Sequence, residues 1–543
     1  MNKSVFTSIK LSTILITAGI AAQAHASGYH FGAQSVSALS TANTNAAEAA
    51  DPSTIFYNPA GLTELSGTQV TGNLFLVKPD VKYNNAEAKY ADGTEVKGQS
   101  NGKIASDVTA VPQLYASHQL NDRVTLGLGV YVPFASETDY DDDAVLRYNV
   151  NETSVKSIDI NPTIAFKINE NHSIGVGVIA QYFDAKLVKF ADFTPIAGAG
   201  AVNTAVSKYQ SNDPLVQASI TAEEKKILGN VQQLTTDLVP KYMALGQSQA
   251  DAIKSAQAEA GNKVAAEVTK QLHAAGKNYD GRATVKGDDW GFGYNLGWLW
   301  KINDSWRVGL NYRSKVSHTL SGEAKWDMVG ADFASQQGQV LSKIIQSPIS
   351  SASPLGGVGY VKSEGATVKV VTPESLSFHT MWKASPKWNL FGNAAWTRHS
   401  RLDQLDINLA NDKFVSNPSG KTNTSTMITN WRDTYSFGLG ASYQQNEQLQ
   451  WRFGVNYDRS PVRDASHRLP TMPDNNRTLF AVGAKYDINP QSSLNFAYAY
   501  MNVKDAELIA EGPKDVNVDS HVKGYAKTNS SANILGVQYT YKF

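Results

Sequence analysis

Strict alternation of apolar with small or polar side chains is the feature that most constrains how this chain can fold. In residues 533–543 the apolar set is Leu535, Val537, Tyr539, Tyr541 and Phe543, and the residues between them are Gly536, Gln538, Thr540 and Lys542. Successive side chains of an extended strand point to opposite faces, so one face of this strand is apolar. The pattern recurs from about residue 67 onward, for example at 290–301, 306–313, 451–458 and 494–500. It predicts an all-β protein whose sheet separates two different solvents.

The connections between these strands alternate in length. Short polar turns lie at 121–122, 169–171, 303–304, 385–387, 445–447 and 489–491. Long polar connections lie at 79–104, 135–152, 191–280, 324–365, 405–430, 461–474 and 504–530. These six turns and seven loops join about fourteen strands. Such sorting is typical of an outer-membrane β-barrel with periplasmic turns and extracellular loops. Residues 67–543 are therefore predicted to form a transmembrane antiparallel β-barrel in the outer membrane of a Gram-negative bacterium.

Aromatic residues at the turns favour the barrel over a soluble β-sandwich. Trp300 and Trp306 flank one turn, and Trp382 and Trp388 flank another, where the interfacial belt of a barrel lies. A sandwich would have to cover every aromatic stripe with a second sheet, and its loops would not sort by length. Beyond the N-terminal segment no apolar run approaches the roughly 18 residues that a transmembrane helix needs. The mature chain is expected to be a monomer in contact with outer-membrane lipid and lipopolysaccharide.

Two segments depart from the strand pattern. Residues 1–26 combine lysines, a short apolar run and Ala24-His25-Ala26, which predicts a secretory signal peptide cleaved after Ala26. Residues 27–66 are rich in Ala, Ser, Thr and Asn and too irregular to cross lipid, so they are expected outside the barrel or as a plug (hatch) in its lumen. Within the 191–280 loop, apolar residues at helical spacing between 213 and 273 predict helices. Their apolar face could cap the barrel rim or form a groove that captures an apolar ligand.

No catalytic signature is present. The chain has no cysteine, so thiolate catalysis and Cys-type zinc sites are excluded, and P-loop and H-E-x-x-H motifs are missing. The G-x-S-x-G match at 98–102 (GQSNG) lies inside the predicted polar loop 79–104 and not at a strand-to-helix elbow. The Gly-x-Gly pairs at Gly127, Gly175, Gly291 and Gly438 lie inside alternating strands and are interpreted as small lumen-facing residues. The acidic residues 139–143 fit a solvated or lipopolysaccharide-bridging loop better than a calcium site. A formal net charge of zero gives no sign of a nucleic-acid partner. We expect no enzyme activity, no cofactor and no metal.

The chain also resembles a known family. Residues 51–65 (DPSTIFYNPAGLTEL), 158–187, 290–314 and 456–486 resemble the FadL family of outer-membrane transporters for long-chain fatty acids and other hydrophobic compounds. Asn58-Pro59-Ala60 is the most specific mark, and the resemblance covers essentially the whole mature chain. It implies a fourteen-stranded barrel closed by an N-terminal hatch. It further implies capture of the ligand among the long loops, binding in an internal pocket, movement of the hatch, and exit sideways into the membrane at a kinked third strand.

The resemblance assigns roles to a few residues. Lys189, at the end of the fifth strand, corresponds to a basic residue that meets the ligand carboxylate, and the alternative is a solvated lysine at a loop base. Phe31 is the second expected ligand-binding residue. The second basic partner of the family falls near Met427, which leaves room for an uncharged cargo. The kink is expected at Val132-Pro133-Phe134, because Pro133 has no N–H for the strand ladder.

Three functions remain open from the sequence. The first is passive uptake of long-chain fatty acids, and the second is the same mechanism for neutral hydrocarbons or aromatic compounds. The third is an adhesin or phage-receptor barrel whose long loops bind partners, in which case removal of the 191–280 loop would abolish cell attachment and leave growth on oleate unchanged.

Overall fold

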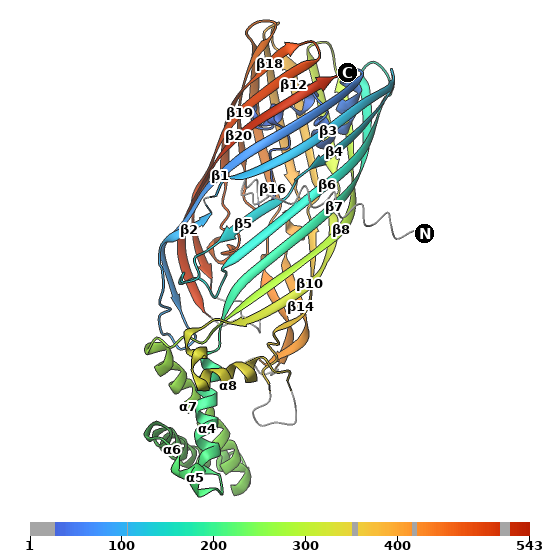
Figure 1. Cartoon of the computed structure of the whole chain (residues 1–543). Helices are drawn as coiled ribbons and strands as arrows, with labels where there is room; N and C mark the ends of the chain where they lie inside the picture. The colour runs from blue at the N-terminus through green and yellow to red at the C-terminus, as the bar shows by residue number, and fades with distance from the viewer. Residues whose placement is uncertain (1–27, 106, 350–356, 415–420, 511–521) are drawn as a thin grey trace, which may run out of the picture.

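A closed antiparallel β-barrel forms the body of the computed structural model, which describes residues 28–105, 107–349, 357–414, 421–510 and 522–543 (Figure 1). β1 (Thr68–Lys89) closes the barrel, because it pairs with β3 (Thr109–Asn121) on one side and with β20 (Lys523–Lys542) on the other. The remaining segments are β2 (Gly102–Ala105), β4 (Val124–Tyr131), β5 (Ala135–Asp139), β6 (Glu152–Lys167), β7 (His172–Asp192), β8 (Asp280–Lys301), β9 (Trp306–Arg313), β10 (Val316–Met328), β11 (Ser363–Thr372), β12 (Ser375–Lys383), β13 (Trp388–Thr397), β14 (Gln404–Phe414), β15 (Lys421–Ile428), β16 (Thr434–Gln444), β17 (Leu449–Asp458), β18 (Arg477–Asn489) and β19 (Ser492–Ala510).

These segments make a wall of fourteen strands, as predicted. β2 is a hairpin partner of β1 outside the count, and five wall strands are each built from two segments: β4 with β5, β9 with β10, β11 with β12, β13 with β14, and β15 with β16. Each of the six predicted short turns joins neighbouring wall strands at one end of the barrel. The strand count was predictable because the turn signals are local in sequence.

The two faces of the wall have the expected character. In β20, Leu535, Val537 and Tyr539 are 54, 46 and 44% exposed, whereas Gln538 and Thr540 are at most 2% exposed. An outward apolar face with buried polar residues inside is the reverse of a soluble protein, and it fits a wall whose outer solvent is lipid.

Several strands are longer than the sequence predicted. β1 runs to Lys89, β19 to Ala510 and β14 from Gln404, all into segments expected to be loops. Above the lipid the outer face of these strands meets water, while inward residues such as Tyr83 and Leu508 are fully buried. Polar residues on the outer face do not end a ladder that is held by backbone hydrogen bonds. The polar composition of these segments marked the edge of the membrane and not the end of the strand.

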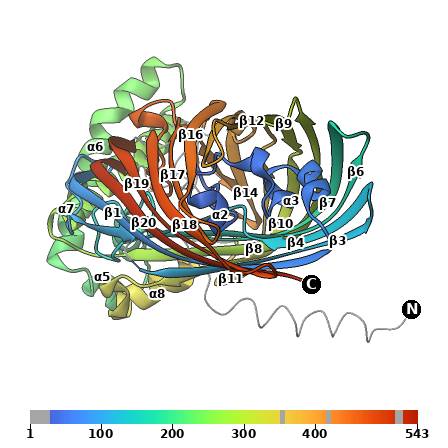
Figure 2. The same cartoon turned by 90° about the horizontal axis from the view of Figure 1, so that it is seen from above.

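The N-terminal segment, residues 28–66, lies inside the ring of strands (Figure 2). It contains α2 (Val36–Leu39), η1 (Ala46–Glu48), α3 (Thr54–Tyr57) and η2 (Pro59–Glu64), which are 3–6 residues long. Such short pieces leave many backbone groups unpaired, and inward-facing polar side chains of the wall bind them. Asn73 accepts from the N–H of Val36 at 3.0 Å, and Asn295 donates to the carbonyl of Ile55 at 2.9 Å. The predicted signal peptide, residues 1–26, lies outside the described residues.

Helices project from the long-loop end of the barrel (Figure 1). They are α4 (Thr194–Tyr209), α5 (Pro214–Ala218), α6 (Ala222–Ala244) and α7 (Gln249–Ala274), and a separate loop carries η3 (Ala331–Ala334) and α8 (Gln336–Ile345). Val202, Ile227 and Val264 join α4, α6 and α7 in one apolar cluster. α4 begins well before residue 213, where the sequence pattern placed the first helix. In the described part of the chain, no helix combines the length and the apolar character needed to traverse a membrane.

Candidate functional site

The Asn58-Pro59-Ala60 motif is seated against glycines of the barrel wall. A Cβ atom added to Gly175 of β7 would lie 2.3 Å from the carbonyl carbon of Pro59. One added to Gly297 of β8 would lie 2.2 Å from Asn58 Oδ1. The wall therefore approaches the motif more closely than any side chain permits.

Asn58 holds this contact by hydrogen bonds. Its Nδ2 donates to the carbonyl of Trp298 at 2.9 Å and lies 2.9 Å from Nε2 of His379. Its Oδ1 accepts from the N–H of Ala60 at 3.1 Å, which caps η2. The side chain is fully buried, so every one of these bonds is shielded from water. The motif thus anchors the N-terminal segment to β8 and β12.

The wall strand formed by β4 and β5 is interrupted at Val132, Pro133 and Phe134. Tyr131 pairs with Asp159 of β6, and Ala135 pairs with Lys156. Between these two pairs the kinked strand advances four residues and β6 only three, so the kinked strand contains one extra residue, as in a β-bulge. On its other side, the pairing of β4 with β3 ends at Val130 and Leu114, while β3 continues beside β1 to Thr109. Among the described residues, no ladder pairs therefore join β3 to the kinked strand beyond Val130 and Leu114.

The start of the N-terminal segment covers this opening in the ladder from inside. The N–H of Phe31 donates to the carbonyl of Pro133 at 2.7 Å, and the N–H of Ala135 donates to the carbonyl of Tyr29 at 3.0 Å. His30 and Phe134 form the bridge between these two bonds. Gln34 adds a hydrogen bond from Nε2 to the carbonyl of Val132 at 2.8 Å. Residues 29–31 thus pair with the kink through a single β-bridge, and Gln34 adds a side-chain contact.

An apolar cavity of about 110 Å³ lies on the long-loop side of this bridge. Its wall is almost entirely apolar and includes Tyr29, Val155, Phe183, Leu187, Leu320, Ala366, Val368, Leu402, Leu405, Met427 and Met472. Lys186 and Lys286 also reach the wall, and Lys186 forms an ion pair with Glu152. A cavity of this kind favours a hydrocarbon chain. We refer to it below as the apolar cavity.

Neither of the two predicted ligand-binding residues, Lys189 and Phe31, lines this cavity. Lys189 is half-buried near the end of β7, on the strand face shared with Leu187, and is not among the residues that line the cavity. Burial lowers the pKa of Lys189 to about 8. Phe31 is fully buried and packs edge-to-face on Phe75, with ring centroids 5.9 Å apart.

Tyr29 is the aromatic residue of the N-terminal segment that reaches the apolar cavity, and the sequence analysis missed it. Its ring packs on Phe134 and Trp431 at centroid distances of 5.2 and 6.2 Å. Tyr29 and Phe31 are two residues apart and would share one face of a regular strand. They face different spaces because the chain forms only an isolated bridge at His30 and is irregular from Phe31 onward.

In the described residues, no group of three or more His, Asp or Glu side chains is placed to hold an ion. Asp139 to Asp143, considered above as a calcium site, belong to that part of the chain.

Comparison with known proteins places these features in one family. Residues 17–543 match the family described as outer membrane protein transport protein (OMPP1/FadL/TodX). A putative outer membrane protein of Neisseria meningitidis serogroup B is 41% identical over 534 residues, which cover 98% of each chain. A long-chain fatty acid transport protein of Escherichia coli O6:H1 is 24% identical and covers 100% of this chain and 99% of its own. The crystal structure of a Pseudomonas aeruginosa FadL homologue superimposes with a TM-score of 0.70 at 20% identity, over 95% of this chain and 100% of that one.

Proposed function

Because the chain belongs to the OMPP1/FadL/TodX family of outer-membrane transport proteins, we propose that it takes up long-chain fatty acids passively and releases them sideways into the membrane. The ligand is captured among the long loops and enters the apolar cavity. Residues 29–34 then leave the kinked strand, and the ligand exits between β3 and β4. An apolar chain gains free energy by passing into lipid instead of water, so no energy source is needed.

One observation supports this route above the others. Tyr29 lines the apolar cavity with its side chain, while its carbonyl oxygen accepts a hydrogen bond from Ala135 at the opening in the ladder. A ligand that fills the cavity therefore presses on the residues that cover the exit. In this route residues 28–66 act as the hatch. Asn58 anchors most of the segment while its first residues move away from the kink.

A disulfide across the kink tests the route. His30 and Phe134 face each other in the bridge, and the chain has no cysteine of its own, so His30→Cys with Phe134→Cys creates one defined crosslink. We expect fatty-acid uptake to be lost in the oxidised double variant and restored by a thiol reductant. Each single variant serves as a control for the loss of the native side chain. Uptake at the wild-type rate while the crosslink is closed would rule out release at the kink.

Recognition of the carboxylate is assigned to Lys189 and is tested separately. A hydrogen bond to a charged group contributes about 1.5–3 kcal/mol, so Lys189→Ala should weaken oleate binding about tenfold or more and leave methyl oleate unchanged. Oleate affinity of the wild type should also fall as the pH rises above about 8, because Lys189 then loses its proton. Equal affinities for acid and ester at every pH would argue against carboxylate recognition.

Neutral hydrocarbons or aromatic compounds are the second candidate cargo. Met427, at the position of the second basic partner in the family, lines the apolar cavity with an uncharged side chain. Of the two lysines that line the cavity, Lys186 and Lys286, Lys186 is already paired with Glu152. The same comparison of oleate with methyl oleate separates the two cargos, since a neutral-cargo channel would bind the ester at least as well as the acid.

A further inference from the structure

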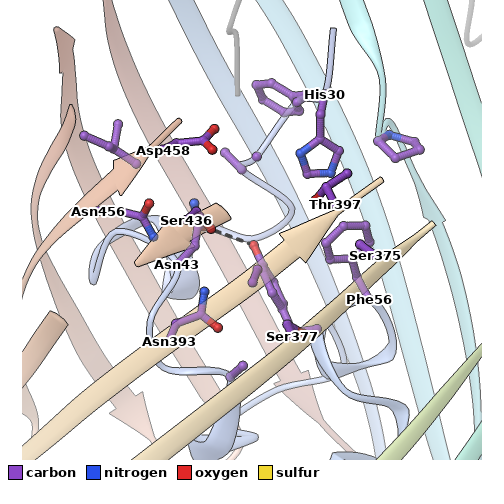
Figure 3. Close-up of a pocket in the computed structure, with 18 of the residues that line it drawn as sticks. His30, Asn43, Phe56, Ser375, Ser377, Asn393, Thr397, Ser436, Asn456 and Asp458 are labelled. Atoms are coloured by element: carbon purple, nitrogen blue, oxygen red, sulfur yellow. Dashed lines mark hydrogen bonds between the residues drawn. The ribbon is translucent and has the colours of Figure 1, made fainter. Parts of the chain in front are cut away.

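A second internal space, here called the polar chamber, lies on the opposite side of residues 29–31 (Figure 3). Its volume is about 180 Å³, and it separates the N-terminal segment from wall strands between β9 and β20. Polar side chains that point into it include Ser377, Asn393, Ser436, Asn456 and Asp458. Apolar residues, among them Phe31, Phe56 and Met501, line the rest of its wall. At roughly 30 Å³ for each water, the chamber has room for about six.

Several buried polar atoms on its wall are unused. Nη1 of Arg477, Oδ1 of Asn311 and Nδ1 of His379 have no hydrogen-bond partner among the described residues. Arg477 is 2% exposed; its Nη2 donates to Asp474 at 2.9 Å, and its Nε lies 3.6 Å from an oxygen of Asp458. Buried donors and acceptors that lack a hydrogen-bond partner mark a site for water or for a polar ligand group.

Phe134 forms the partition between the two spaces. Tyr29, which lines the apolar cavity, packs on the ring of Phe134 with centroids 5.2 Å apart. His30, which lines the polar chamber, packs on the same ring at 5.4 Å. Pro133 and Phe134 themselves line the chamber. The chamber therefore borders the kink where the ladder is open.

This position matters for any cargo with a polar head. A tail that leaves sideways into lipid must not drag an unpaired carboxyl through apolar surroundings, because that costs several kcal/mol. Lys189 cannot bind the carboxyl during release at the kink, because it lies near the long-loop end of β7. The outward apolar residues Ile174, Val176 and Val178 lie nearer the other end of that strand. The polar chamber offers unused hydrogen-bonding groups beside the exit itself.

We propose that the polar chamber holds the carboxyl head of a single-chain amphiphile while its tail passes the kink. Arg477 donates to the carboxyl oxygens, and Asn311 accepts from the hydroxyl when the acid is protonated. A hydrocarbon without a head does not use the chamber. The chamber thus selects for amphiphiles at the release step, whereas Lys189 acts at binding. This inference rests on the proposed route of release.

The test compares two cargos of equal chain length, oleate and 1-octadecene, in cells that depend on this protein for uptake. Ser377→Trp fills the chamber, and Ser321→Trp on the outer face of β10 is the matched control. Loss of one hydrogen bond to a charged group predicts oleate uptake about tenfold slower in Ser377→Trp, with octadecene uptake unchanged. Oleate affinity of the purified variant should stay within about twofold, because binding in the apolar cavity is untouched.

A second variant guards against misfolding. Asn311→Leu keeps the size of the side chain and removes its amide, so it should selectively slow uptake of the protonated acid without blocking the space. It also removes the 3.4 Å hydrogen bond from Nδ2 to the carbonyl of Phe56, and octadecene uptake controls for that loss. Equal slowing of both cargos, or of neither, in the two variants would overturn the assignment of the chamber. Failure of the wild-type protein to take up either cargo would instead refute the proposed function, so the two failures are distinguishable.

Discussion

Gly175→Ala is the sharpest test of how the N-terminal segment is held. The added methyl group would lie 2.3 Å from the carbonyl carbon of Pro59 and 2.4 Å from the N atom of Ala60. Ordinary carbon contacts are about 3.5–4.0 Å, so the motif must retreat by roughly 1 Å. Both atoms belong to the backbone, and no change of side-chain rotamer can relieve the overlap.

The expected cost combines two effects. Overpacking of this kind costs about 1–3 kcal/mol, and weakening a hydrogen bond of Asn58 costs about 0.5–1.5 kcal/mol more. A total of about 2–4 kcal/mol would increase the population of the unseated segment roughly 30- to 1,000-fold. The barrel ladder itself should be little affected, because β7 keeps its pairing with β6 and β8.

Hydrogen exchange of residues 58–61 measures this population. The N–H of Ala60 and the N–H of Gly61 bond within the motif, to Oδ1 and to the carbonyl of Asn58. Their exchange should accelerate by that factor in Gly175→Ala, whereas peptides of the barrel wall should be unchanged. Gly72→Ala is the matched control, since a Cβ there meets nothing within 4 Å. Wild-type exchange at Ala60 and Gly61 in Gly175→Ala would show that the motif is not seated as described.

Two further predictions concern the apolar cavity and the helical loop. Ala366→Phe should put a ring into the cavity of about 110 Å³ and weaken binding of oleate at least about tenfold, with stability changed by at most about 1–3 kcal/mol; unaltered affinity in calorimetry would exclude this cavity as the binding site. His273 of α7 lies 2.7 Å from Asp92 and 3.0 Å from Asp192. Burial alone would lower the pKa of His273, but hydrogen bonds and charge from Asp192 and then Asp92 outweigh it and raise the pKa above 6.5. The contact should therefore stabilise the helices fully below about pH 6.5 and be lost as the pH rises through the raised value. The melting temperature of the helices, followed by circular dichroism, should be lower at pH 9 than at pH 6 in the wild type. The part of this difference that comes from the His273 contact should be absent in His273→Gln.

The wall of this barrel was readable from the sequence because its signals are local. Alternation with period two assigns each strand residue to lipid or lumen, as in Leu535 and Gln538, and short turns fix the strand count. Polar composition did not mark the strand ends, because β1 and β19 continue above the lipid, where their outer face meets water and their inner face stays buried. The helical pattern predicted helices only from residue 213 onward. α4 was not predicted because it is rich in Ala and Gly, which give little apolar periodicity.

The interior depended on the tertiary structure. The sequence by itself determined that an irregular N-terminal segment with Asn58-Pro59-Ala60 precedes fourteen strands and that Pro133 interrupts one of them. Only the fold brought Gly175 and Gly297 against that motif, turned Tyr29 and not Phe31 into the apolar cavity, and opened the polar chamber beside Phe134. The physical reason is that these contacts join residues far apart in the chain, largely through backbone hydrogen bonds, which any residue with an N–H can make and which therefore leave no pattern in the side chains.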